Sequence, residues 1–435
     1  MKKIVLLGVG STHFTKDLVE SLMLGGGDWD LRMVDIDANC LDIALNLGLK
    51  LNEHYKTGIK ISGSTDRLDV LEGADVVVST IGVGGRKAWA QDVYMFREFN
   101  IHQSTGDTFG AGGISRAIRT IPVLLEVARD VERLCPDALF VNFTNPMSVN
   151  CWALNKYSKV KTIGLCYGVT YYQNVLAHLI GVPFKETWTK AVGVNHFTWI
   201  TDFTHNGKDA WPRVREALAA DPSKRAGNVY TWELFDTFGA FPTVGDGHVC
   251  EFMPLMQAQG AYYGNTFGDK FEDYQAYWDG VFANMSDQAY GNKALEIRKD
   301  PSAESGVVFR DEALFMDVIN AALFNGTPVE RTVNLPNNGV IPNLPNDAIL
   351  EVTTLVNSAG FHPYNYGPLP PGLNAILQRV TSSHALTVEA AVSGDPNLVI
   401  QALLTDNIAP TRAIANKIAD KIFEIHKPYL THFNK

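Results

Sequence analysis

Cysteine is scarce in this sequence, and its arrangement is irregular. The 435 residues include five cysteines, widely spaced and without a CxxC pair: Cys40, Cys135, Cys151, Cys166 and Cys250. An odd number at such spacing argues against the disulfide framework of a small secreted domain. We therefore expect free thiols, mostly buried as small apolar residues, in a cytoplasmic protein.

Long apolar runs and blocks of basic residues are also missing. No apolar stretch approaches the roughly 18 residues of a membrane span. The apolar start at Ile4 breaks at Gly8, which favours a first strand over a signal peptide. Lys and Arg number 37 against 47 Asp and Glu, so the formal net charge is −10. Such an acidic chain is a poor candidate for binding nucleic acid or an anionic membrane, and we expect neither partner.

The composition instead suits a large folded core, with 46% hydrophobic and 19% charged residues. In the first third of the chain, short apolar runs alternate with helical patterns. Strands are predicted at 3–8, 30–35, 59–62, 74–80, 138–142 and 161–165, and helices at 13–24, 41–55 and 115–135, the last interrupted by Pro122. Apolar runs separated by helices predict a parallel sheet with crossover connections.

From about Cys166 onwards this alternation stops. Longer helical stretches, aromatic clusters and Pro/Gly loops follow, including 188–199 and 363–372. We therefore expect two domains, a parallel-sheet domain over residues 1–165 and a mixed α+β domain over residues 166–435. No low-complexity linker separates them, so a tight interface is expected.

A glycine-rich turn follows the first predicted strand and precedes a helix. Gly8, Gly10 and Ser11 lie in this turn, and Asp35 ends the next strand, 25 residues beyond Gly10. A Rossmann-type dinucleotide site needs this order, because the glycines admit the pyrophosphate and the acid accepts the ribose hydroxyls. His13 replaces the third glycine of the motif. Asp35 favours NAD over NADP; the alternative is a plain glycine turn with Asp35 as a helix cap.

Two further strand ends carry polar or glycine-rich turns. Thr80 and Gly82 follow the fourth predicted strand, in a turn that passes under the cofactor in such folds. Asn145 follows the fifth strand and is expected at the nicotinamide end. The alternative for Asn145-Pro146 is an Asx turn.

Together these motifs resemble one family. They comprise Gly8-Val9-Gly10-Ser11, Gly106-Asp107-Thr108, Gly112-Gly113-Ile114-Ser115-Arg116, Asn145-Pro146-Met147, Gly164-Leu165-Cys166, Gly193-Val194-Asn195-His196-Phe197, Gly245-Asp246, 334–339 and 344–348. The combination resembles glycoside hydrolase family 4, the NAD- and metal-dependent glycosidases, over nearly the whole chain. Residues 103–108, 195–201 and 245–248 look most similar to its α-galacturonidase members. The resemblance implies a lactate/malate dehydrogenase-like fold.

The resemblance also implies the chemistry. These enzymes are exceptions to hydrolysis by two carboxylates. NAD takes a hydride from C3 of a small carbohydrate, the C2 proton is removed with help from a Mn²⁺-type ion, the leaving group departs from C1, water adds and the hydride returns. The cofactor is not consumed.

The family positions assign roles to residues of this chain. Cys166 and His196 match the metal ligands; a thiolate and an imidazole alone would suggest zinc. Their alternatives are a buried thiol and a structural histidine. Asp246 matches the C2 base, and Asp107 the acid that assists departure of the aglycone. The alternative for both is a turn or capping residue.

Other residues are candidates for contacts with the sugar. Asn145 and Asn195 are expected to bind it. His248 and Cys250 alternate with Asp246 along a possible strand, and His248 is the better candidate for a substrate contact. Arg116, in the first turn of a helix, is a candidate for binding an anionic group; its alternative is a surface ion pair.

One departure from the family pattern concerns the sugar. Many members that act on unphosphorylated substrates carry Cys-His where this chain has Cys166-Tyr167, so the resemblance specifies the reaction class more firmly than the sugar. A 2-hydroxyacid dehydrogenase of the lactate/malate type, which needs no metal cysteine, is the alternative enzyme. A catalytically silent NAD sensor is the third hypothesis. The fold favours a homodimer or homotetramer.

Overall fold

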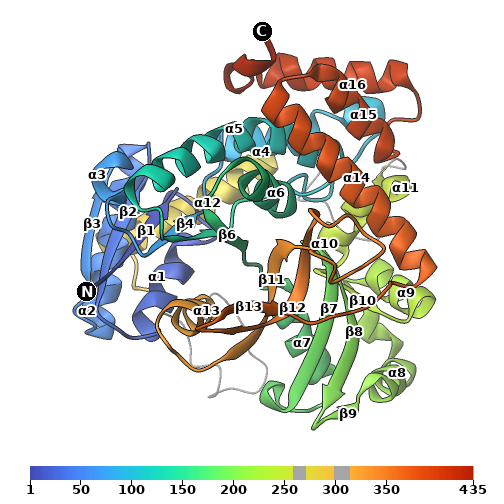
Figure 1. Ribbon diagram of the computed structural model, residues 1–435, viewed down its shortest axis with the longest axis horizontal. Helices are drawn as coiled ribbons and strands as arrows, with labels where there is room; N and C mark the ends of the chain where they lie inside the picture. Colours follow the sequence, from blue (N-terminus) through green and yellow to red (C-terminus); the bar gives the residue numbers. More distant parts are fainter. Residues whose placement is uncertain (258–270, 298–313, 435) are drawn as a thin grey trace.

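The amino-terminal part of the chain alternates strands and helices around a parallel sheet. The computed structural model describes residues 1–257, 271–297 and 314–434 (Figure 1). The strands of this part are β1 (Lys2–Leu7), β2 (Trp29–Val34), β3 (Lys60–Ser64), β4 (Val76–Ser79), β5 (Leu139–Asn142) and β6 (Lys161–Gly164). Its helices are α1 (Thr15–Leu24), α2 (Ala38–Tyr55), α3 (Leu68–Leu71), α4 (Gly85–Tyr94), α5 (Gly110–Leu134) and α6 (Met147–Tyr157).

The order of these strands confirms the predicted Rossmann-type sheet. They lie in the order β3-β2-β1-β4-β5-β6, and each neighbouring pair is parallel. Every residue of β4 and β5 is buried, because helices cover both faces of such a sheet. The carboxyl ends of these strands therefore meet at one edge, where ligands bind in open α/β sheets.

The second part of the chain adds antiparallel strands to the same sheet. Its strands are β7 (Thr187–Val194), β8 (Phe197–His205), β9 (Lys208–Asp209), β10 (Phe241–Thr243), β11 (Val329–Pro336), β12 (Ile349–Asn357) and β13 (Gly360–Pro363). Its helices are α7 (Gly168–Leu179), α8 (Trp211–Ala220), α9 (Val229–Phe238), α10 (Asp246–Val249), α11 (Pro254–Gln257), α12 (Phe271–Tyr290), α13 (Leu314–Leu323), α14 (Pro371–Ser393), α15 (Pro396–Thr405) and α16 (Arg412–Ile425).

One sheet thus runs through both predicted domains. β11 joins β6 where Asn334 pairs with Gly164, and β12, β7, β8 and β10 follow in order. In Figure 1, α14 to α16 lie at the top and right of the molecule, and α14 packs against α5 and α6. The division at 165/166 remains a prediction, since the sheet continues across it.

The aromatic-rich residues 187–205 form the β7–β8 hairpin. Two local predictions differ from the structure. α5 continues through Pro122. Buried apolar residues on both sides of Pro122 pack against the core and stabilise the helix there. Residues Asp246 to Cys250 are helical turns and not a strand. The N–H groups of His248 and Val249 both donate to the carbonyl of Gly245, which starts the helix there.

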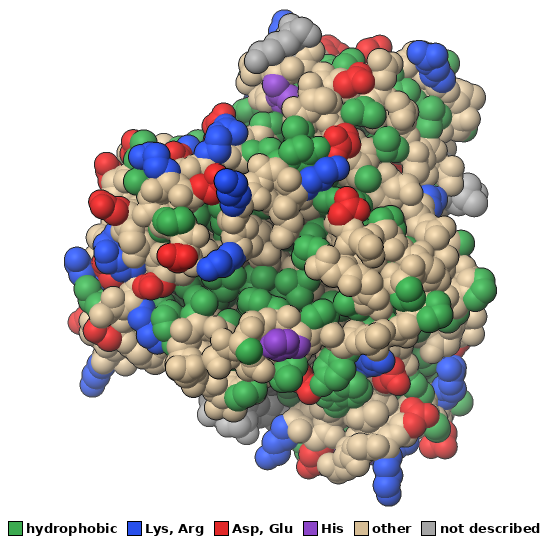
Figure 2. All heavy atoms as spheres, in the orientation of Figure 1, with side chains coloured by type: hydrophobic (Ala, Val, Ile, Leu, Met, Phe, Trp, Pro, Cys, Tyr) green, Lys and Arg blue, Asp and Glu red, His purple; other side chains and the backbone are tan. Residues whose placement is uncertain are grey.

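The surface and the thiols agree with the composition. All five cysteines are free. Within the described residues, no helix has the length and apolar character needed to span a membrane. On the face shown in Figure 2, Lys and Arg side chains are interspersed with Asp and Glu, while hydrophobic side chains gather near the centre.

Candidate functional site

The glycine turn after β1 brings three strand ends into close contact. Gly8 has a positive φ of 86°, and a Cβ there would lie 2.8 Å from the Cα of Ile81, beyond the end of β4. A Cβ on Gly10 would lie 2.9 Å from an oxygen of Asp35, beyond the end of β2. A side chain at Gly8 would collide with the backbone, and one at Gly10 would have to displace the side chains of Asp35 and Cys40. Both positions thus favour glycine, as the dinucleotide interpretation requires.

Asp35 holds this turn in place. Its carboxylate accepts the N–H of Gly10 at 2.7 Å and the N–H of Asp37 at 3.0 Å. Asp37, rather than Asp35, caps α2 by accepting the N–H groups of Asn39 and Cys40. Both residues therefore shape the turn, and a carboxylate with lone pairs remaining can still accept ribose hydroxyls.

The other predicted cofactor residues lie at the same edge. The hydroxyl of Thr80 donates to the carbonyl of Gly8 at 2.9 Å, which ties the end of β4 to the turn. Ser11 accepts the N–H of Phe14 at 3.2 Å, just before α1. Gly82 has open space where a Cβ would lie. The contacts of these residues with a cofactor remain predictions.

Three side chains from separate elements form a compact polar cluster. Asp107 precedes α5, His196 lies in the turn between β7 and β8, and His248 lies in α10. One ligand atom from each lies within 4.8 Å of the others, an arrangement that could hold a metal ion. The two imidazole rings have centroids 3.9 Å apart. The prediction had placed all three at the site, but only His196 as a metal ligand.

Asp107 is held as a carboxylate. It accepts the hydroxyl of Thr108 at 2.5 Å and the amide of Asn145 at 3.0 Å. Burial alone would raise its pKa, but the charges of His248, Arg116 and His196 outweigh burial and lower the pKa of Asp107 to about 2. The side chain is therefore ionised at neutral pH and is suited to binding a cation.

The two histidines differ in their protonation. Burial and the charges of His248 and His13 hold the pKa of His196 well below its usual value, so its ring is neutral and can act as a ligand. Burial also lowers the pKa of His248, but the Glu251 and Asp107 carboxylates outweigh it and raise that pKa. The charge of His13, which lies in the glycine turn, thus affects the pKa of a cluster residue.

Arg116 joins the cluster from the first turns of α5. Its Nε donates to the carbonyl of Asn145 at 3.1 Å, and its guanidinium lies 5.4 Å from the centroid of the Trp89 ring. The structure therefore brings together Asp107, Asn145, Arg116, His196 and His248.

The half-buried Cys166 and the buried Asn195 belong to an adjacent group. The Asn195 amide lies beside both the Cys166 thiol and the Glu351 carboxyl, without forming a regular hydrogen bond to either. Burial, and then the charge of Glu351, raise the pKa of Cys166 to about 12. Burial likewise raises the pKa of Glu351 to about 7. Binding of a metal at Cys166 would therefore displace a proton.

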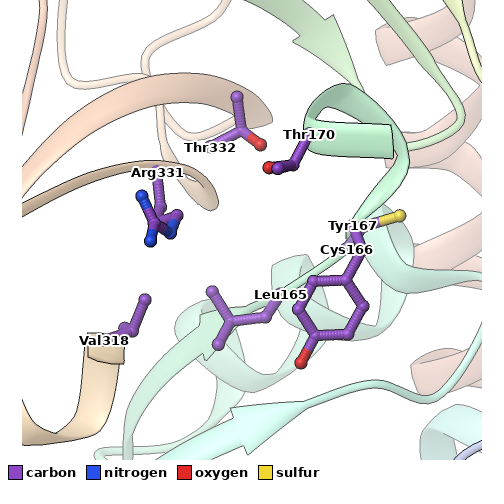
Figure 3. Close-up of a pocket in the computed structure, with 7 residues that line it drawn as sticks. All are labelled: Leu165, Cys166, Tyr167, Thr170, Val318, Arg331 and Thr332. Atoms are coloured by element: carbon purple, nitrogen blue, oxygen red, sulfur yellow. The ribbon is translucent and has the colours of Figure 1, made fainter. Parts of the chain in front are cut away.

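Tyr167, the residue that departs from the family pattern, lines a pocket beside Cys166. Thr170, Arg331 and Thr332 line the same pocket. Figure 3 shows the sulfur of Cys166 turned away from the other lining side chains. Because Cys166 is not among the three clustered residues, its role as a metal ligand remains a prediction.

Asp246 occupies a different setting. Its carboxylate accepts the N–H of Tyr230 at 3.0 Å and the N–H and hydroxyl of Thr231 at 2.8 and 2.7 Å. These donors begin α9, so Asp246 caps that helix from a distance in the sequence. The arrangement fits the capping alternative, and the role of Asp246 as a base remains a prediction.

Sequence reasoning missed three residues that build the site. Glu251 accepts the N–H of Gly106 and lies 3.5 Å from His248 Nδ1. Thr108 bridges Asp107 and His196, at 2.5 and 2.7 Å. Glu351 accepts the hydroxyl of Thr198. Thr108 lies in the motif Gly106-Asp107-Thr108, although no role was assigned to it. Glu251 carried a local signal because it lies three residues after His248 in a helical segment.

Comparison with known proteins places the chain in a class and then in a family. It matches the glycosyl hydrolases, through the model described as "Family 4 glycosyl hydrolase" over residues 3–182 and the "Family 4 glycosyl hydrolase C-terminal domain" over residues 191–409. The chain therefore belongs to the family 4 glycosyl hydrolases, which confirms the resemblance.

Relatives and solved structures cover most or all of the chain. An alpha-galacturonidase of Bacillus subtilis (strain 168) is 30% identical over 81% of each chain, and an alpha-galactosidase of the same strain is 28% identical over 100% of each. A Thermotoga maritima 6-phospho-beta glucosidase, solved with manganese, NAD+ and glucose-6-phosphate, has a TM-score of 0.81 at 22% identity, over 98% of this chain and 99% of that one. Malate dehydrogenase of Plasmodium falciparum has a TM-score of 0.54 at 16% identity, over 90% of this chain and 99% of that one. The dehydrogenase-like fold is thus confirmed.

Proposed function

We propose that this protein hydrolyses α-linked uronides, α-galacturonides foremost, with NAD and Mn²⁺ as cofactors. The observation that carries the proposal is the cluster of Asp107, His196 and His248 beside the glycine turn. Family membership supports the reaction class, and an alpha-galacturonidase is among the relatives. We further propose that it works in the cytoplasm as a homodimer or homotetramer.

The residues present fit a bound NAD. Because Gly8 and Gly10 have no Cβ atoms, the turn at the end of β1 packs closely against its neighbours. Hydrogen bonds from Asp35 and Thr80 fix the shape of this turn. NAD supplies a reversible hydride acceptor. Asn145, at the end of β5 and bonded to Asp107, links this cofactor edge to the clustered residues.

The residues also fit a divalent metal, in two ways that share His196. The cluster offers a carboxylate and two imidazoles, a set that suits Mn²⁺. The family resemblance instead pairs His196 with Cys166. Such an ion supplies Lewis acidity toward oxygens of the sugar.

The protein's own groups then handle protons. Asp246 is assigned removal of the C2 proton, and Asp107 protonation of the departing oxygen. Since Asp107 is ionised at neutral pH, it must first receive a proton. When Cys166 and His196 hold the metal, Asp107 and His248 are not ligands. His248, whose pKa is raised, then has its Nδ1 3.8 Å from an Asp107 oxygen and is the group placed to supply one.

Positive charge around the site favours an anionic sugar. His248 and Arg116 lower the pKa of Asp107 by their charges, so the same field attracts a uronate carboxylate. Arg116 is the side chain that we assign to that carboxylate, because its charge is permanent.

The test compares aryl α-galacturonide, α-glucuronide, α-galactoside and α-glucoside, each with and without NAD and Mn²⁺. We expect hydrolysis of the galacturonide only when both cofactors are present. The absorbance of NADH should not rise during the reaction. Full activity after removal of NAD and metal would contradict the proposal. Net NADH formation from a 2-hydroxyacid, without glycoside hydrolysis, would favour the dehydrogenase alternative.

A further inference from the structure

The buried hydroxyl of Thr108 links the Asp107 carboxylate to the His196 ring. Thr108 Oγ1 lies 2.5 Å from Asp107 Oδ1 and 2.7 Å from His196 Nδ1. All three side chains are buried. Both distances are short enough for good hydrogen bonds, so the direction of each bond is decided by the supply of protons.

Counting protons fixes those directions. A threonine hydroxyl has one proton to donate, and a carboxylate can only accept. The hydroxyl proton therefore points to Asp107, and a lone pair of the Thr108 oxygen faces His196 Nδ1. A neutral imidazole carries a single N–H, and only an N–H at Nδ1 satisfies this contact.

We propose that Thr108 is a positioning residue that holds His196 in the Nδ1–H tautomer and leaves the lone pair on Nε2. The Nδ1–H follows from the two hydrogen bonds of Thr108, and the lone pair on Nε2 follows because the buried ring is neutral. Its consequence, a ring prepared to bind a metal through Nε2, rests on the proposed function.

The loop that carries Thr108 is fixed at several points, so the hydroxyl has a defined position. The hydroxyls of Ser104 and Thr105 both donate to the carbonyl of Gly247. The N–H of Gly106 donates to Glu251, and Asp107 accepts the amide of Asn145.

His196 is held from its own side as well. It occupies the tight turn between β7 and β8 with a φ of +65°, a conformation that allows little adjustment for a residue with a side chain. The preceding residue, Asn195, donates its N–H to Ser148 at 3.1 Å. The backbone segments that carry both partners of the Thr108–His196 bond are therefore held in place.

The direct test is ¹⁵N NMR of the full-length protein labelled at histidine, free of NAD and metal. The His196 signals are identified by their loss in His196→Asn. We expect a protonated Nδ1 and an unprotonated Nε2 in the wild type and in Thr108→Ser, which keeps the hydroxyl. Thr108→Val, similar in shape but without the hydroxyl, is expected to gain Nε2–H tautomer.

The second readout is Mn²⁺ affinity, measured by titration calorimetry on the same NAD-free proteins. Loss of an outer-shell partner typically weakens metal binding by about 10–100-fold, so we expect this range for Thr108→Val and near wild-type affinity for Thr108→Ser. An Nε2–H tautomer in the wild type, or an unchanged tautomer in Thr108→Val, would overturn the proposal. An Nδ1–H tautomer in a wild type that binds no Mn²⁺ would support the positioning role and count against the metal in the proposed function.

Discussion

Asp246 is the residue at which a structural role and a catalytic role are hardest to separate. Its carboxylate accepts three hydrogen bonds from the start of α9. Asp246→Asn replaces one accepting oxygen with a donor, so we expect a loss of about 0.5–2 kcal/mol in unfolding free energy, as for a lost helix cap. If Asp246 is also the C2 base, turnover should fall by roughly 10²–10⁴-fold. Urea unfolding and initial rates measure the two effects.

Thr231→Val is the matched control for that substitution. It removes one donor to Asp246 but keeps the carboxylate, so it should lower stability and leave most of the turnover. Deuterium from D₂O should appear at C2 of the released sugar in both the wild type and this control. Equal activity losses in Asp246→Asn and Thr231→Val would show that Asp246 only caps α9.

At the residue scale, the sequence predicted the site in part. His196, His248, Asp107, Asn145 and Arg116 do lie together, because family motifs mark positions that a fold brings to one edge. The motifs could not show how the side chains are bonded. Asp246 is engaged by α9, and that contact depends on a helix that no motif describes.

At the scale of one element, the start of α5 depends on Gly113, which has no side chain. The loop before the helix crosses its first turn so closely that a Cβ on Gly113 would lie 2.5 Å from the carbonyl carbon of Thr108. Gly113→Ala should therefore push that loop away, with a loss of about 1–3 kcal/mol as in other overpacked sites. Thermal unfolding and Mn²⁺ titration should both respond, since Thr108 and Asp107 would move.

Gly280→Ala provides the control within another helix. A Cβ at Gly280, in α12, would meet no atom within 4 Å. The substitution should raise stability by roughly 0.5–1 kcal/mol, because alanine loses less entropy in a helix. Mn²⁺ affinity should be unchanged in Gly280→Ala. An unchanged affinity in Gly113→Ala as well would contradict the role assigned to the loop.

Elements were predicted best where one physical signal dominated. The strands of the parallel sheet were found within about two residues of their ends, because both faces are buried and the strands read as apolar runs. The continuity of the predicted helix through Pro122 and the short helix at 246–249 were not predicted. In both, packing and capping contacts from distant residues outweigh local preference.

At the scale of the whole molecule, a buried charge network ties the carboxyl-terminal segment to the parallel-sheet half. Asp92 of α4 accepts hydrogen bonds from Ser115 at 2.7 Å, from Arg119 at 3.0 Å and from His426 at 3.0 Å. His426 lies 334 residues from Asp92 in sequence, so no local pattern could have predicted the contact.

Asp92→Asn should be among the most destabilising single substitutions in the protein. Arg119 and Asp92 are almost fully buried, with 1% and 0% of their side chains exposed, and removing one charge leaves the other without its counter-charge. Breaking a buried pair in this way typically costs about 3–5 kcal/mol. Glu389→Gln, which breaks the exposed pair with Lys156, should cost less than about 1 kcal/mol.

The same network predicts how stability depends on pH. Burial would raise the pKa of Asp92, but Arg119 and His426 outweigh it and lower that pKa. The unfolded chain therefore takes up a proton at a higher pH than the folded chain. The contribution of Asp92 should be complete above about pH 5 and lost as the pH falls toward its folded pKa. Urea unfolding of the wild type and Asp92→Asn measures this, and their difference should shrink only on the acid side. A difference that is constant down to low pH, or one as small as that of Glu389→Gln, would show that Asp92 does not hold the carboxyl-terminal segment through its charge.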